Sequence, residues 1–256
     1  MNHLRKFELE NDYLQAKDSF VYPNVSYIVE KNLLYYMKNT KYDFVDLGLP
    51  SGLKWAAWNV GATKPEESGL YFAWGEDKGY VVTRGELQDE SKGLYTAVIT
   101  NADGTETTKT FAQDYSDYKH YENDELIKYN GTDGLTTLET EDDGCYLTEK
   151  AMRMPTYDDC VELVENTTSA WTENYNDSGI NGLTLTSKTN GNSIFVPAVG
   201  AVGSGVLNLF GLYGVFWSSS LYSSVEKAFD FVFNSDFLDV DDVNRFGGLP
   251  LRAVRP

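Results

Sequence analysis

The C-terminal segment, residues 211–256, constrains the fold more than any other part of the chain, because apolar residues there recur at strand spacing between glycines. Phe229, Phe231 and Phe233 occupy every second position, which predicts a strand with one buried face. Asp230 lies at the opposite parity and is therefore expected to point outward. The segment favours short antiparallel strands over a helix.

The next apolar stretch, residues 237–243, has the same period. Leu238 and Val240 share one parity, whereas Phe237, Asp239 and Asp241 share the other. A strand here would bury the two aliphatic side chains against a core. It would present the two acids and one aromatic ring together.

Two kinds of position alternate along this segment. The residues typical of a fixed frame are Gly211, Gly214, Trp217, Ser218, Ser219, Ser220, Phe233, Arg245, Gly248, Arg252 and Arg255. Between them lie the candidate binding residues, which are mainly aromatic, small polar and acidic: Tyr213, Val215, Tyr222, Ser223, Ser224, Asp230, Asn234, Asp236, Phe237, Asp239, Asp241, Asp242, Asn244 and Phe246. Such a mixture is typical of an antibody paratope. It predicts recognition rather than catalysis.

The composition predicts a β-rich α+β protein without nucleic-acid or membrane partners. Apolar residues make up 41% of the 256 residues and aromatic residues 14%, and aromatic side chains favour strands. The formal net charge of −18 would repel nucleic acid and an anionic membrane surface. No apolar run reaches the roughly 20 residues that span a bilayer. Residues 1–10 lack the apolar core of a signal peptide.

The sequence offers few residues for metal or redox chemistry. Cys145 and Cys160 are the only cysteines, and their spacing fits neither a disulfide framework nor a zinc knuckle. We expect two buried thiols, with Cys160 in the core of a helix. His3 and His120 are too few for a multi-histidine site. No metal ion and no cofactor is predicted.

The chain divides into a small N-terminal module, residues 1–40, and a main domain, residues 41–256. The module is expected to form a helix over 12–20 and a hairpin from 25–29 and 33–37, too little for a core of its own, so it would dock elsewhere. Residues 77–143 are polar and predict a long insert, with strands only near 80–83 and 94–100.

Local signals in the second half predict one helix and several strands. Apolar residues recur at helical spacing over 156–167, and Thr156 with Asp159 forms a capping-box pattern. The Asn190-Gly191 turn predicts a hairpin between strands at 183–186 and 193–196. Further strands are expected at 215–219, 228–234 and 250–254.

Six phrases carry a family resemblance: VDLGLPSGLKWAAWNVGA (45–62), YFAWGE (71–76), MRMPT (152–156), NGNSIFVPAVG (190–200), GVFWSSS (214–220) and LRAVRP (251–256). Over residues 42–256 the chain resembles a large family of Bacteroidetes and phage proteins. That family has a C-type-lectin-like fold related to the formylglycine-generating-enzyme fold. The resemblance implies this fold here, and residues 1–38 resemble N-terminal segments of Bacteroides phage virion proteins.

Some members of that family are target proteins of diversity-generating retroelements, in which template adenines are copied with errors into the 3′ end of the gene. Their frame phrases are matched here by residues 217–220, residues 233–235 and the Arg245, Gly248, Arg252 spacing. An Asn codon diversified in this way does not yield Lys, Glu, Gln, Met or Trp. Between residues 221 and 249 only Glu226 and Lys227 belong to that excluded set.

The resemblance implies binding by a preformed surface without catalysis. Tyr213, Tyr222, Phe237 and Phe246 would be aromatic anchors, and the acids would select a basic or hydroxyl-rich ligand. The expected partner is a protein or glycan on a host or neighbouring cell. The expected location is a phage tail or a cell surface, with assembly into a homo-oligomer or virion as a further expectation.

Three alternatives accompany this interpretation. The fold relatives that are oxidases use a cysteine pair and a copper ion, which Cys145 and Cys160 would have to supply. Calcium-dependent sugar binding would use the acids of residues 239–242, although the lectin tripeptides Glu-Pro-Asn, Gln-Pro-Asp and Trp-Asn-Asp are absent. A structural virion or surface protein would use the same surface only for neighbouring subunits.

Overall fold

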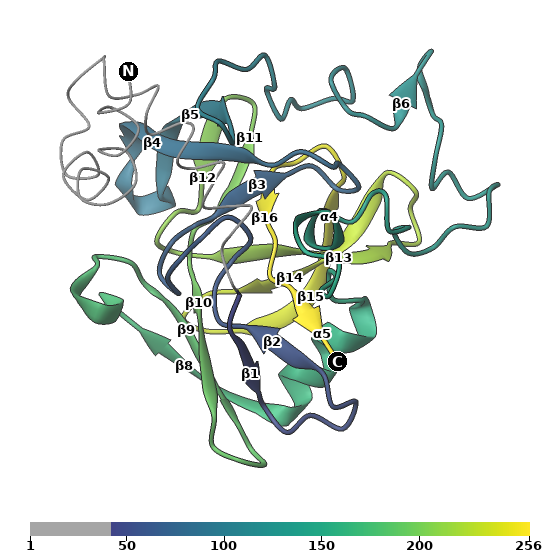
Figure 1. Ribbon diagram of the computed structural model, residues 1–256. Helices are drawn as coiled ribbons and strands as arrows, with labels where there is room; N and C mark the ends of the chain where they lie inside the picture. The colour runs from purple at the N-terminus through teal and green to yellow at the C-terminus, as the bar shows by residue number, and fades with distance from the viewer. Residues whose placement is uncertain (1–41) are drawn as a thin grey trace, which may run out of the picture.

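Antiparallel pairing of short strands builds most of the domain (Figure 1). The structure is a computed structural model that describes residues 42–256. The expected β-rich α+β composition is confirmed within this range. The helix and hairpin predicted for residues 1–40 lie outside the described residues.

The strands form four larger sheets and a short hairpin. The first sheet has the order β1 (Phe44–Asp46), β2 (Lys54–Ala56), β17 (Val254–Arg255), and the second has the order β10 (Ser193–Pro197), β9 (Gly182–Ser187), β8 (Thr167–Thr172). The six-stranded sheet has the order β11 (Ala201–Gly203), β12 (Val206–Asn208), β5 (Leu94–Asn101), β4 (Tyr80–Asp89), β3 (Leu70–Phe72), β16 (Leu249–Pro250). The C-terminal sheet has the order β13 (Gly214–Leu221), β14 (Lys227–Phe233), β15 (Leu238–Asn244), and the hairpin pairs β6 (Tyr121–Glu122) with β7 (Glu125–Leu126).

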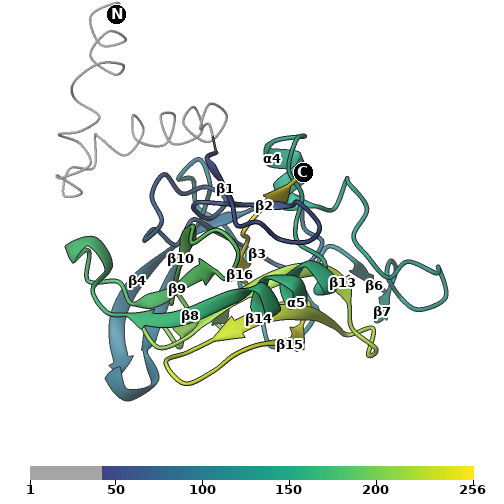
Figure 2. The ribbon, with the colours of Figure 1, turned by 90° about the horizontal axis from the view of Figure 1, so that it is seen from below.

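Two α-helices lie within residues 42–256, α4 (Gly144–Thr148) and α5 (Tyr157–Asn166). The predicted capping box at the start of α5 is confirmed, since Thr156 and Asp159 exchange side-chain and backbone hydrogen bonds. Cys160 and Leu163 bury the inner face of the helix. Figure 2 shows α5 lying across the C-terminal sheet, which it contacts through β13, β14 and β15.

The C-terminal sheet is covered on both faces. On the α5 side, Phe231 and Phe233 of β14 join a core with Phe216. On the other side, Trp217 and Ala228 belong to a second core. The strands predicted at 215–219, 228–234 and 237–243 and the hairpin of β9 and β10 are confirmed, and the register places Phe231 opposite Phe216 and Val240.

The strand predicted at residues 250–254 is divided in two. β16 pairs with β3 in the six-stranded sheet, and β17 pairs with β2 in another sheet. Arg252 lies between them with its guanidinium buried, donating to Asn59 Oδ1, Ala56 O and Phe195 O. Burial lowers the pKa of this guanidinium, because no carboxylate is among these partners. The chain changes sheets where this side chain enters the core.

The insert, residues 77–143, is only partly an excursion from the core. Its first half forms β4 and β5, which extend the sheet that begins with β3. The residues after β5 run outward past β6 before they return at α4 (Figure 1). Phe111, Tyr118 and Tyr129 of this second half are buried, so the segment is anchored rather than loosely attached.

Arg245, just after β15, holds the insert against the C-terminal sheet. Its side chain is fully buried and donates from Nε to Tyr118 Oη and from Nη2 to Lys128 O, both at 3.0 Å. Its Nη1 donates to Tyr129 O at 3.0 Å and to Val225 O at 2.8 Å. Four acceptors from three segments therefore converge on one guanidinium.

We expect Arg245→Lys to lower the free energy of unfolding by about 2–4 kcal/mol, because an ammonium group cannot reach all four acceptors and leaves buried oxygens unpaired. The insert should also become sensitive to native-state proteolysis. Urea unfolding and limited proteolysis measure both effects. Arg255→Lys is the control, since Arg255 is half-buried over the Phe44 ring. Equal urea midpoints for Arg245→Lys and wild type would contradict this assignment.

Candidate functional site

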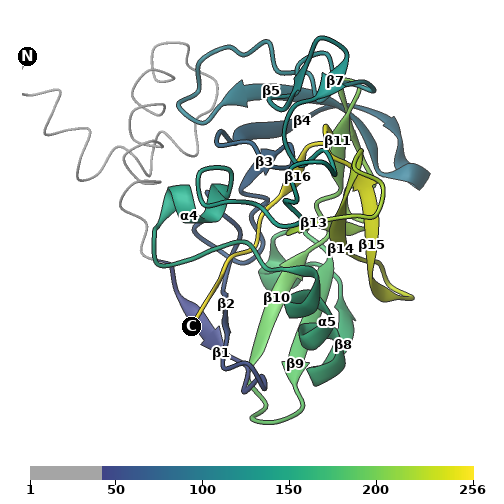
Figure 3. The same ribbon diagram turned by 90° about the vertical axis from the view of Figure 1, so that its right-hand side faces the viewer.

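Strand β15 is an edge of the C-terminal sheet within the described chain (Figure 3). The candidate binding residues lie on β15, on the turn before it and the loop after it, on β13 and β14, and in the loops before β13 and between β13 and β14. Seven of them are exposed: Ser223, Ser224, Asp236, Phe237, Asp239, Asp241 and Asn244. Five are half-buried: Tyr213, Tyr222, Asn234, Asp242 and Phe246. Val215 and Asp230 are buried.

The exposed residues surround the strand rather than forming one flat face. Asp239 and Asp241 pair across from Val232 and Asp230, so they lie on the side of the sheet away from α5. Asp242 and Asn244 lie on the α5 side. Asp242 is the partner of Lys227, whose Nζ is 2.6 Å from Asp242 Oδ2. Phe237, Asp239 and Asp241 are each exposed, and their presentation as one surface stays a prediction.

Asp230 corrects the sequence prediction, because it is only 3% exposed. Alternation along β14 indicated which residues share a face but not that both faces are covered. The row Trp217, Asp230, Asp241 crosses the sheet beside a core. Asp230 Oδ1 has no hydrogen-bond partner within the described residues. Burial, reinforced by the charges of Asp241 and Asp242, raises the pKa of this carboxyl to about 7.

Val215 is a second correction. It lies near the start of β13, is 6% exposed and pairs with Val232. Both valines pack against the core that contains Trp217. A side chain in this position contributes to packing and cannot contact an external ligand.

Two of the predicted aromatic anchors make internal contacts. Tyr222 packs against Phe229, with ring centroids 5.0 Å apart. Phe246 packs edge-on against Tyr115 of the insert, also at 5.0 Å. Phe237 remains 44% exposed and contacts Tyr213 at 6.0 Å. Phe237 is therefore the aromatic side chain of this set that is best placed to meet a ligand.

The turn between β14 and β15 borders an open groove of about 280 Å³. Asn234, Asp236 and Phe237 form one side of it, and Thr167, Ser169 and Trp171 of β8 form the other. The sequence prediction included the turn residues and missed those of β8. No local pattern links the two segments, which are distant in sequence and meet only in the fold.

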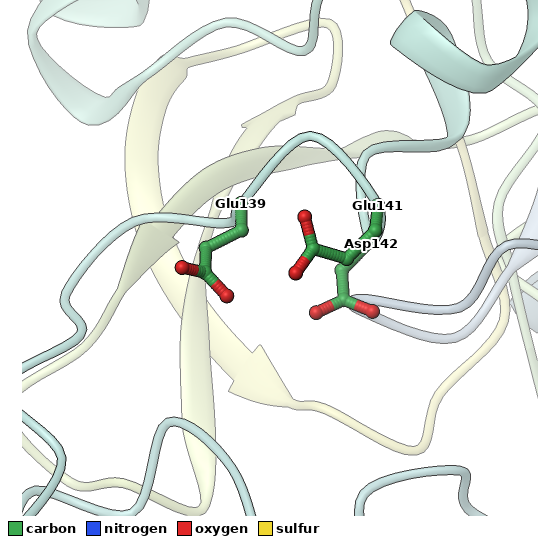
Figure 4. Close-up of side chains that lie close together, drawn as sticks. All are labelled: Glu139, Glu141 and Asp142. Atoms are coloured by element: carbon green, nitrogen blue, oxygen red, sulfur yellow. The ribbon is translucent and has the colours of Figure 1, made fainter.

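Three carboxylates of the insert form an acidic cluster with the spacing of potential metal ligands. Ligand-type oxygens of Glu139, Glu141 and Asp142 lie within 4.8 Å of one another, and Figure 4 shows their side chains. The ammonium of Lys128 lies 2.7, 3.3 and 2.6 Å from these three carboxylates. A protein cation therefore already lies among the three carboxylates and offsets part of their charge, so the arrangement fits a metal ion poorly.

Hydrogen bonding reinforces the charge of this cluster. Burial alone would raise the pKa of Asp142, but hydrogen bonds from Lys119, Lys128 and Tyr129 outweigh it and lower the pKa to about 2. The Lys128 ammonium is likewise held in its charged form, with its pKa raised by Asp142 and Glu139 against the effect of burial. The cluster joins two parts of the insert, because Lys119 and Lys128 both contact Asp142.

The two cysteines do not form the pair that the oxidase alternative requires. Cys145 belongs to the core around Trp74, and Cys160 belongs to the core under α5. Both are free and fully buried, and burial raises the pKa of both thiols. The prediction that Cys160 is a core residue of a helix is confirmed.

Comparison of the chain with family models, with curated proteins and with solved structures finds no match in any of the three. Within residues 42–256, no helix is both long and apolar enough to cross a membrane.

We expect Asp230→Asn to remove a pH-dependent loss of stability. A carboxyl whose folded pKa lies above its ordinary value costs stability as pH rises from about 4 through 7, at up to about 1.4 kcal/mol per unit of pKa difference. The variant should therefore be more stable than wild type at pH 8, by about 2–4 kcal/mol, and differ little at pH 4.

Urea unfolding across this pH range measures the effect. Asp239→Asn is the matched control, because Asp239 is exposed on the neighbouring strand. The control should leave the pH profile unchanged. Parallel profiles for Asp230→Asn and wild type would show that this carboxyl is not buried in its charged form.

We expect calcium chloride and EDTA to give the same melting temperature for the wild-type protein, because Lys128 contacts all three clustered carboxylates. Lys128→Met should destabilise the fold by about 1–2 kcal/mol, since the pairs are partly exposed. Added calcium should raise the melting temperature of this variant alone. A wild-type melting temperature that falls in EDTA would contradict the assignment.

Proposed function

We propose that this chain is a non-catalytic binding protein whose exposed residues around β15 contact a protein or glycan on a host or neighbouring cell. The observation that carries this proposal is the separation of roles in residues 211–256. Most frame residues are buried, whereas seven of the candidate residues are exposed on one strand and its adjoining loops. Exposed side chains on a fixed backbone can recognise a ligand without rearrangement of the fold.

The proposed fold is C-type-lectin-like, related to that of the formylglycine-generating enzyme. In support, the six phrases that carry the resemblance contact one another in the core. Trp217 Nε1 donates to Phe72 O, and Trp74 Nε1 donates to Ser218 O, each at 2.8 Å. Tyr71 Oη donates to Val199 O, and Ser219 N donates to Pro155 O. These contacts are expected of phrases that define one fold.

Diversification of the surface by a retroelement is part of the proposal. Substitutions at exposed positions such as Ser223 or Asp241 should change stability by no more than about 0.5 kcal/mol. Adenine mutagenesis of an Asn codon does not produce Glu, which suggests that Glu226 belongs to the fixed frame. Its backbone contributes to that frame. Its carbonyl accepts hydrogen bonds from Arg245 N and Tyr115 Oη.

The exposed acids favour a basic or hydroxyl-rich ligand. Asp236, Asp239 and Asp241 lie along one strand and its leading turn, in a chain of net charge −18. They would repel anionic ligands, nucleic acid included. Display on a phage tail or a cell surface, in a homo-oligomer or virion, would let several weak contacts act together.

A structural virion or surface protein is the second candidate, in which β15 contacts only neighbouring subunits. The half-buried Phe246 and Tyr222 pack within the chain and favour neither candidate. The exposed acids favour the first candidate, since a permanent subunit interface is depleted of charge at its centre.

We expect the triple variant Asp239→Asn, Asp241→Asn, Asn244→Ala to lose at least tenfold of its binding to bacterial cells and glycan arrays, while its melting temperature stays near that of wild type. All three side chains are exposed and have few internal contacts. Flow cytometry with labelled protein measures the binding.

The matched control is Glu86→Gln, Glu90→Gln, Gln88→Ala on the distant β4 hairpin, which is also exposed. This control should bind as wild type does. Equal binding by both triple variants would exclude the β15 surface as the contact.

A further inference from the structure

The groove between β8 and the turn that joins β14 to β15 is built from two independent parts of the chain. Trp171 and Ser169 belong to β8, which follows α5, and Asn234, Asp236 and Phe237 belong to the turn. Its volume of about 280 Å³ lies just below the range for small-molecule sites, which begins at about 300 Å³. A single ring-sized group fits such a space.

Both sides of the groove are held in place before any ligand binds. Asn234 Oδ1 accepts from Asp236 N at 2.7 Å and from Phe237 N at 3.0 Å, and Asn234 N donates to Phe237 O. This closed turn fixes the directions of the Asp236 and Phe237 side chains. On the opposite side, Trp171 pairs with Leu183 in the ladder of β8 and β9 and packs on the core under α5. Preorganisation of this kind lowers the entropic cost of binding.

The polar groups of the groove are mostly neutral groups that both donate and accept hydrogen bonds. The lining includes four neutral polar residues, Thr167, Ser169, Asn234 and Ser235, and a single carboxylate, that of Asp236. Neither lysine nor arginine lines it. The lining therefore disfavours an anion.

We propose that this groove binds the terminal residue of a neutral glycan. A pyranose ring presents an apolar C–H face, which suits the rings of Phe237 and Trp171, and hydroxyls that need both donors and acceptors. A basic side chain would need acceptors alone, and one carboxylate among four neutral groups supplies few. The inference rests on the proposed binding function and names the ligand class for one end of the β15 surface.

The experiment titrates the full chain with methyl glycosides of glucose, galactose, mannose, fucose and N-acetylglucosamine. Choline and Nα-acetyl-lysine methylamide serve as cationic probes. Saturation-transfer NMR detects contact, and tryptophan fluorescence reports Trp171, because it is the only one of the five tryptophans that lines the groove. We expect at least one glycoside to bind and the cationic probes not to bind.

Phe237→Ala and Asp236→Asn should each weaken glycoside binding about tenfold, the change that corresponds to roughly 1.4 kcal/mol. Trp171→Phe should abolish the ligand-dependent fluorescence change. Leu87→Ala is the matched control, since Leu87 on β4 is 47% exposed and Phe237 is 44% exposed. The control should bind as wild type does.

Three outcomes would overturn the proposal: no glycoside binds, the cationic probes bind in their place, or glycoside binding is unchanged in Phe237→Ala and Asp236→Asn. The proposed function has its own test, the triple variant of Asp239, Asp241 and Asn244. These three residues lie outside the groove lining, so unchanged cell binding in that variant would reject the proposed function and not the groove. Loss of cell binding in that triple variant with no glycoside binding would retain the function and reject the groove.

Discussion

The burial of the Arg245 guanidinium determines how the C-terminal sheet and the insert fit together. A buried cation without a carboxylate partner is costly unless its donors are satisfied, and here Tyr118 Oη and carbonyls from three residues satisfy them. The rings of Trp74 and Tyr118, at 4.8 and 5.2 Å, add cation–π contacts. Because two of the acceptors are carbonyls of residues 128 and 129, the insert must follow one path. The backbone of Arg245 also forms hydrogen bonds with the backbones of Trp74 and Glu226. The loop between β13 and β14, which contains Glu226, is therefore fixed as well.

A sheet with both faces covered leaves its edge as the part that is free to vary. Phe231 and Phe233 fill the core under α5, and Trp217 fills the other, so a change at any of them would leave a cavity or an overpacked site. Asp239, Asp241 and Asn244 project from β15 into solvent and can be exchanged at little cost. The surface proposed for recognition is therefore narrower than alternation along the strands indicates.

The parts of the fold that could be predicted are those specified by neighbouring residues. Thr156 and Asp159 specify the start of α5, and the Asn190-Gly191 turn specifies the hairpin of β9 and β10. Alternation located β14 and β15, since a period of two is a local property. It could not place Asp230, whose burial depends on what covers the second face. It also could not place Trp171 in the same groove as Phe237, or pair Arg245 with Tyr118, because these arrangements join segments that the sequence separates. The C-type-lectin-like fold itself stays a prediction.

The acids of β15 also determine how a ligand can be recognised. An edge strand offers unpaired backbone groups, to which another strand can add. Two such chains meeting at β15 would place Asp239, Asp241 and Asp242 against like charges, which opposes pairing between copies. Under the proposed function, the acids of this edge favour recognition through side chains over extension of the sheet by a second copy. Side-chain recognition tolerates exchange of single residues, whereas strand addition depends on a backbone that does not vary. An acidic edge on a fixed strand thus suits a surface whose specificity changes while its fold does not.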